Sequence, residues 1–103
     1  MDRIQKIKEF LQQSPNDSFL RHALALEYIK LGEDVAAKQL FEDILARDPA
    51  YVGSYYHLAK LLERNENVDD AIRVYEKGME EAQKAGENHA YGELRSAYEE
   101  LIY

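Results

Sequence analysis

The stretch from Leu24 to Pro49 reads LALEYIKLGEDVAAKQLFEDILARDP, which is the pattern of two amphipathic helices joined at Gly32. The pattern returns 34 residues later. The matching pairs are Leu24 and Leu58, Ala25 and Ala59, Ala37 and Ala71, and Phe41 and Tyr75. A fixed period in this range is typical of helical repeats that stack on one another. The spacing therefore predicts an all-α chain built from pairs of helices.

Working outward from this stretch, apolar residues at helical spacing predict six helices and no strand. We expect the helices at residues 2–13, 18–31, 35–47, 51–64, 68–84 and 88–102. Gly32 can take the left-handed conformation that closes the second helix, and Gly86 breaks the fifth. Linkers of only a few residues separate the helices, so 103 residues are expected to form one domain.

Short polar residues before several helices are candidate caps. Asn16 or Asp17 can cap the second helix, and Asp34 can cap the third. Asn67 with Asp70 three residues later resembles a capping box for the fifth helix.

Composition excludes several classes of protein. The chain has no cysteine, which rules out a disulfide framework, a thiolate metal site and a cysteine nucleophile. Its net charge of −7 and the lack of a Lys/Arg run argue against nucleic-acid binding, which depends on cationic contacts to phosphate. No apolar run is long enough to span a membrane, and the polar first residues resemble no signal region, so cytoplasm is the expected location. The acidic excess is either a solubility feature or an attraction for a basic partner.

Small and large residues alternate where the helices of each pair would cross. Ala25 and Ala37 allow one pair to approach closely, and Tyr28 and Phe41 fill the space beside them. Over residues 18–51 the pattern comprises Leu24, Ala25, Tyr28, Gly32, Ala37, Phe41, Ile44 and Pro49.

These positions resemble the tetratricopeptide repeat, a family of 34-residue helix-turn-helix units. The resemblance implies a right-handed superhelix of antiparallel helix pairs, an α-solenoid of about six helices in a single domain over residues 1–103. It divides the chain into a half repeat (2–13), repeat one (18–51), repeat two (52–85) and a C-terminal capping helix (88–102). Arg21 stands where the first aromatic is expected, and Gln83 replaces the closing proline of repeat two. The fifth helix is therefore expected to run on for an extra turn.

The resemblance also implies a function, because this family holds peptides or partner helices in a concave groove lined by the first helix of each pair. We therefore expect a protein–protein interaction module. Helix periodicity places Glu63 and eight candidate groove residues on that face: Phe19, His22, Leu26, Ile29, Lys30, Tyr56, Lys60 and Arg64. Gly92, Ser96 and Glu99 fall in the same place on the last helix.

A partner segment could set an apolar anchor on Phe19 and Tyr56 while Lys60 meets a carboxylate. The alternative is that Leu26 and Ile29 pack on the first helix and that the lysines are simply solvated. One branch of the family grips the terminal carboxylate of a chaperone with Lys and Asn side chains. His22, Leu26 and His57 stand at the corresponding positions here, so chaperone-tail binding is not predicted.

No enzyme, metal or cofactor site is predicted. His22, His57 and His89 are 35 and 32 residues apart and form no helical ligand pair. The five glycines are scattered and make no phosphate-binding loop. We expect no catalytic residues, because no pair of carboxyl groups is placed to face across an enclosed pocket.

A second hypothesis is self-association. The chain begins and ends on half repeats, and the last helix could expose Leu101, Ile102 and Tyr103. Two such ends could pair by a two-fold contact into a weak homodimer that serves as a structural scaffold.

Overall fold

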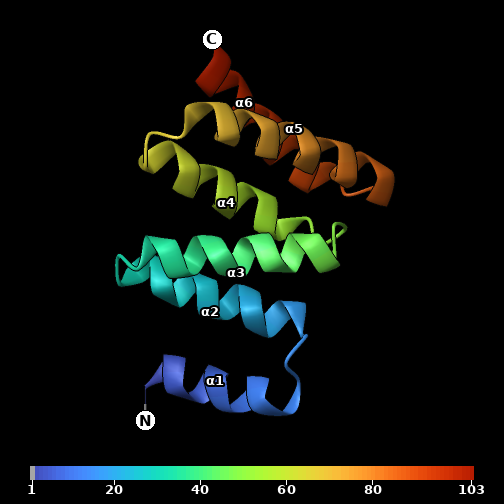
Figure 1. Ribbon diagram of the computed structural model, residues 1–103. Coiled ribbons are helices and arrows are strands. Elements are labelled where there is room, and N and C mark those ends of the chain that lie inside the picture. The colour runs from blue at the N-terminus through green and yellow to red at the C-terminus, as the bar shows by residue number, and fades with distance from the viewer. Residues whose placement is uncertain (1) are drawn as a thin grey trace. The chain divides into compact units, whose positions relative to one another are not determined.

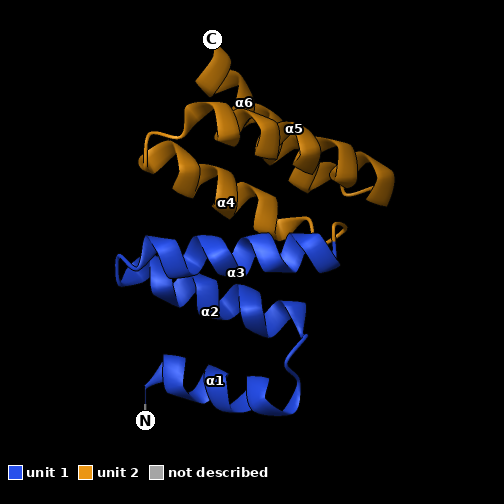
Figure 2. Ribbon diagram, in the orientation of Figure 1, with its two compact units in different colours: residues 1–48 blue, residues 49–103 orange. Residues whose placement is uncertain are grey.

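The computed structural model describes residues 2–103, so that Met1, the first residue of the expected domain, lies outside the described part. These residues form six α-helices and no strand, as predicted (Figure 1). The helices are α1 (Arg3–Gln13), α2 (Ser18–Lys30), α3 (Asp34–Arg47), α4 (Gly53–Arg64), α5 (Val68–Ala85) and α6 (Asn88–Ile102). The chain divides into two compact units, Met1–Asp48 and Pro49–Tyr103, which are described separately below (Figure 2).

One predicted cap is confirmed and another lies one residue away. The Asp17 carboxylate accepts a hydrogen bond of 3.0 Å from the Leu20 backbone N–H at the start of α2. Asp34 was predicted to cap α3, but Glu33 occupies the cap position and Asp34 is the first helical residue. The Glu33 carbonyl already accepts the Ala37 N–H, so the helix begins one residue earlier than expected.

The predicted capping box at α5 is wrong. Asn67 stands at the cap position, but its side chain makes no capping hydrogen bond. The Asn67 N–H donates to the Leu62 carbonyl at 2.8 Å, so it needs no acceptor from the helix. The Asp70 carboxylate binds Arg73 one turn further along α5.

In the first unit, α2 packs against both α1 and α3. Ala25 and Ala37 are fully buried, as expected for small residues where two helices cross closely. Phe41 of α3 fills the space beside them and is also fully buried. On α1 the structure buries Ile7, whereas Phe10 remains 54% exposed.

In the second unit, α5 packs against both α4 and α6. Ala59 and Ala71 are fully buried, as are their counterparts 34 residues earlier. Tyr75 has no exposed surface and occupies the position that Phe41 has in the first unit. The recurrence predicted from the sequence therefore describes equivalent core positions.

At Gly78, α5 approaches both α4 and α6 closely. A Cβ atom at this position would lie 2.7 Å from the Cβ of Tyr55 and 3.1 Å from a methyl group of Leu94. Contacts this short leave room for hydrogen only, so Gly78 sets how tightly α5 sits between α4 and α6.

Tyr75 adds a polar contact that Phe41 lacks. Its hydroxyl donates a hydrogen bond to the Glu63 carboxylate, which joins α5 to α4. Burial, followed by this hydrogen bond and the charge of Glu63, raises the pKa of Tyr75 well above its ordinary value. The neutral phenol is therefore the form that the fold stabilises.

The expected extra turn of the fifth helix is confirmed, because α5 has 18 residues and α3 has 14. The four added residues, 82–85, follow Glu81, whose side chain is buried and whose carboxylate lies 2.9 Å from the Lys77 ammonium. Lys84 approaches the same carboxylate at 3.6 Å. The hydrogen bond from Lys77 lowers the pKa of Glu81, which explains why a buried acidic side chain is tolerated here. Gly86 then ends the helix with a left-handed φ of 70°.

Candidate binding site

The eight residues predicted to line a groove fall on two helices, one in each unit. Five lie on α2 of the first unit and three on α4 of the second. Each set is described within its own unit.

The α2 set is partly exposed and partly engaged in packing. Phe19 is 69% exposed and is a large apolar side chain on the surface. His22, Leu26 and Ile29 are half-buried. The His22 ring meets the buried Phe41 ring edge-on, with 5.6 Å between centroids, so this histidine contributes to the core of the unit.

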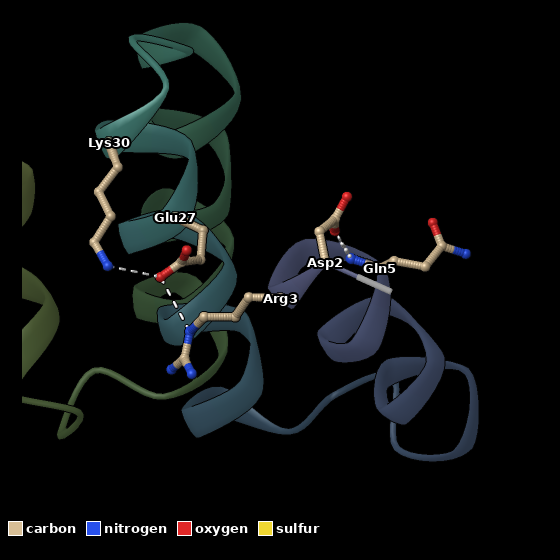
Figure 3. Close-up of polar contacts among 5 residues, drawn as sticks. All are labelled: Asp2, Arg3, Gln5, Glu27 and Lys30. Atoms are coloured by element: carbon tan, nitrogen blue, oxygen red, sulfur yellow. Dashed lines mark hydrogen bonds and ion pairs between the residues drawn. The ribbon is translucent and has the colours of Figure 1, made fainter.

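Lys30, the remaining predicted residue of α2, has an intramolecular partner. Its ammonium lies 3.1 Å from the Glu27 carboxylate (Figure 3). The same carboxylate oxygen accepts a hydrogen bond of 3.1 Å from Arg3 of α1. Asp2 caps α1 beside this pair by accepting the Gln5 N–H at 2.8 Å. Glu27 therefore ties α1 to α2, and Lys30 completes a small charged cluster.

The second unit contains an open cleft of about 600 Å³ between α4 and α6. Its lining comprises Tyr56, Lys60, Asn88, His89, Gly92, Glu93, Ser96, Ala97 and Glu100. Four residues predicted on one surface line this cleft: Tyr56, Lys60, Gly92 and Ser96. Arg64 was predicted on the same surface but does not line the cleft.

Glu99 was predicted on this surface of α6, but it does not line the cleft. Its carboxylate accepts a hydrogen bond of 3.3 Å from Arg95, and Glu100 lines the cleft instead. The periodicity of the α-helix explains why Glu100 lines the cleft, because side chains four residues apart lie on the same face of a helix. From Gly92 and Ser96 this step leads to Glu100, and the parallel row is His89, Glu93 and Ala97. Continuing the four-residue step would have found these missed residues.

On the α4 wall, an aromatic ring and a cation lie together. The Lys60 ammonium is 5.8 Å from the centroid of the Tyr56 ring, within range of a cation–π interaction. It also lies 3.7 Å from the Glu63 carboxylate. The charge of Lys60 is therefore partly compensated before any partner arrives.

On the α6 wall, two carboxylates face the cleft. Glu93 lies 3.8 Å from the His89 ring nitrogen, a contact that is an ion pair only when the imidazole is protonated. Glu100 has no hydrogen bond or ion pair among the described residues. Burial lowers the pKa of His57 on α4, and the charge of Glu93 acts in the opposite direction.

Residues 2–103 contain neither a cluster of metal ligands nor a helix suited to cross a membrane. None of their histidine, aspartate and glutamate side chains gather in a group of three or more that could hold a metal ion. None of the described helices is long and apolar enough to cross a membrane.

Comparison with known proteins now identifies the family. The tetratricopeptide repeat profile matches residues 28–98, which is more than half of the chain, so the chain belongs to the tetratricopeptide repeat family. Proteins with these repeats generally mediate protein–protein interactions and are generally not enzymes.

Similar structures and sequences support the same class. A tetratricopeptide repeat domain protein from Salinibacter ruber is 44% identical with a TM-score of 0.81, over 84% of this chain and 88% of that one. The TPR2B domain of yeast Sti1, solved in a complex with pHsp70, has a TM-score of 0.88 at 15% identity, over 96% and 79% of the two chains.

Among curated proteins, the chain is similar to interferon-induced protein with tetratricopeptide repeats 3 from Mus musculus. The two are 24% identical over 76 residues, which is 74% of this chain. The chain spans about a fifth of the length of that relative, 19%.

Proposed function

We propose that this protein is an interaction module that holds a peptide or helix of a partner protein in the cleft between α4 and α6. The observation that carries the proposal is the cleft itself, about 600 Å³ in volume and lined by an aromatic ring, a lysine and two carboxylates. A concave site with a few convergent polar groups suits a ligand that must be oriented as well as held. No catalytic step, metal or cofactor belongs to this function.

Tyr56 is the proposed anchor of the site. It is partly exposed, lines the cleft, and is held by edge-on contact with the His57 ring at 5.6 Å between centroids. Tyrosine is among the residues that contribute most to binding energy, because its rigid ring covers a large area at little entropic cost. Partner side chains that pack on this ring would therefore supply most of the affinity.

The exposed part of α2 is proposed as a further contact surface in the first unit. Phe19 offers an apolar ring that is 69% exposed, and exposed apolar side chains with polar neighbours often mark interaction surfaces. Lys30 is also exposed, although the Glu27 carboxylate already binds it. His22, Leu26 and Ile29 contribute through their exposed parts, and Arg64 is kept as a proposed contact on α4.

The proposal is tested by selecting binders from a displayed library of short random peptides on the immobilised protein. Labelled copies of the enriched peptides are then titrated by fluorescence anisotropy. Tyr56→Ala is expected to weaken binding at least about 30-fold, which corresponds to roughly 2 kcal/mol for a main anchor. Gly92→Leu should have a similar effect, because a side chain built at Gly92 meets nothing within 4 Å and extends into the cleft without removing a contact.

Gly92→Ala is the matched control, since a single methyl group leaves the cleft open. Circular dichroism would confirm that all three variants keep the helical content of the parent protein. Peptides that bind Tyr56→Ala and Gly92→Leu as tightly as the parent would show that the cleft is not the site.

Self-association remains the second candidate. It is favoured by the exposure of the chain end, where Ile102 is 39% and Tyr103 is 94% exposed. Light scattering at micromolar concentration separates the candidates, because a dimer would have twice the monomer mass of 12.0 kDa. A molar mass that stays at the monomer value would remove the second candidate.

A further inference from the structure

We infer that the segment held in the cleft between α4 and α6 is basic, with Lys or Arg side chains that bind Glu93 and Glu100. This inference rests on the proposed function, and it reverses the expectation that Lys60 would receive a carboxylate of the partner. It follows from which charges of the cleft already have partners and which do not.

Lys60, the lysine that lines the cleft, already has interaction partners within the protein. Lys60 has the Glu63 carboxylate at 3.7 Å and the Tyr56 ring at 5.8 Å. A partner carboxylate would have to compete with both contacts, and it would face the two further negative charges on the opposite wall, α6. Lys60 is therefore poorly placed to attract an acidic segment.

The anions are the groups left to be satisfied. Glu100 has no hydrogen bond or ion pair among the described residues, and its charge contributes to the raised pKa of Tyr75. The ion-pair contact of Glu93 is with His89, whose side chain is 91% exposed. Both carboxylates line the same cleft, so a cationic side chain could enter between the walls and bind either one.

The surrounding charge favours the same partner. Residues 49–103 carry six Lys and Arg against eleven Asp and Glu, a net charge of −5 out of the −7 of the whole chain. The negative field is therefore concentrated in the unit that contains the cleft. A field of this sign raises the association rate of a basic segment and repels an acidic one.

Tyr56 offers a basic partner segment a surface for stacking in addition to the charges of the cleft. The ring lies on the opposite wall from the two carboxylates and already has one cation near its face. An arginine side chain could stack on the exposed part of this ring while its guanidinium reaches a carboxylate, because arginine combines both contacts better than lysine. We expect arginine to be the more frequent basic residue among bound segments.

The test uses the same peptide selection with three charge variants. The selected peptides should carry a net positive charge, and Glu93→Gln combined with Glu100→Gln should weaken their binding about tenfold or more. The control is Glu66→Gln with Asp69→Asn, which changes the net charge equally on exposed residues outside the cleft and should alter binding less than about threefold. Lys60→Ala should increase the affinity, because it removes from the cleft a cation that repels a basic segment.

The outcomes separate the two proposals. Peptides that lose binding to Tyr56→Ala but are neutral or acidic, or that are insensitive to the double glutamine variant, would keep the cleft and overturn the basic partner. A loss of binding in Lys60→Ala comparable to that in Tyr56→Ala would also overturn it. If the selected peptides ignore Tyr56→Ala and Gly92→Leu, the proposed function itself fails.

Discussion

Replacing Tyr75 by alanine is expected to lower the free energy of unfolding by about 3–5 kcal/mol. Tyr75 is fully buried, so the substitution leaves a cavity of nearly a whole ring in the centre of the second unit. It also leaves the Glu63 carboxylate without the hydroxyl that donates to it. The free energy of unfolding of a small domain is only about 5–15 kcal/mol, so this substitution removes a large share of the stability. Urea denaturation followed by circular dichroism measures the loss.

Tyr75→Phe separates the two parts of this effect, because it keeps the ring and removes the hydroxyl. The expected loss is about 1.5–3 kcal/mol, the range for a hydrogen bond to a charged group. The raised pKa of Tyr75 also predicts an effect of pH on stability. Because the native state favours the neutral phenol, the hydroxyl contributes its full stabilisation when the pH is below the pKa of Tyr75 in the unfolded state. This stabilisation declines as the pH rises above that pKa. The parent protein should therefore lose stability above pH 10 more steeply than Tyr75→Phe. Equal slopes would contradict the assigned role of this hydroxyl.

Gly78→Ala is expected to destabilise the protein by about 1–3 kcal/mol, although alanine is the better helix former. The new methyl carbon would lie 2.7 Å from the Cβ of Tyr55, an atom that no side-chain rotation can move away. The helices α4 and α5 must separate to admit it, and the surrounding contacts loosen. Thermal and urea denaturation of the variant measure the cost.

Gly92→Ala provides the comparison of opposite sign. A Cβ at Gly92 meets nothing within 4 Å, and the residue lies within α6. The same substitution should therefore stabilise the protein by up to about 1 kcal/mol through helix propensity alone. If both glycine variants shifted stability in the same direction, the close approach at Gly78 would not be the cause.

The helices and the buried positions of the repeat could be predicted because they depend on local spacing. Leu24 and Leu58, for example, are both buried, and the extra turn of α5 followed from Gln83 in place of proline. The hydrogen bonds that cap the helices were harder to predict from the sequence. Asp70 does not accept the Asn67 N–H because the Leu62 carbonyl already does, a contact that sequence spacing does not reveal.

The candidate site was only partly visible in the sequence. Periodicity placed Tyr56 and Lys60 together on the face of α4 that lines the cleft, but it could not show which charges find partners inside the molecule. Glu63 partly compensates the charge of Lys60, and Glu100 has no ion pair among the described residues. These pairings depend on how side chains lie in space, and they change the expected partner from acidic to basic.

The arrangement of the second unit has a consequence for how binding and order are linked. Because α5 packs on both α4 and α6, the last helix is held mainly through one face, and it has few contacts with α4. Elements held on one side are the first to open in local unfolding. A segment bound in the cleft would contact α4 and α6 at once. Its binding would therefore stabilise α6 against local unfolding.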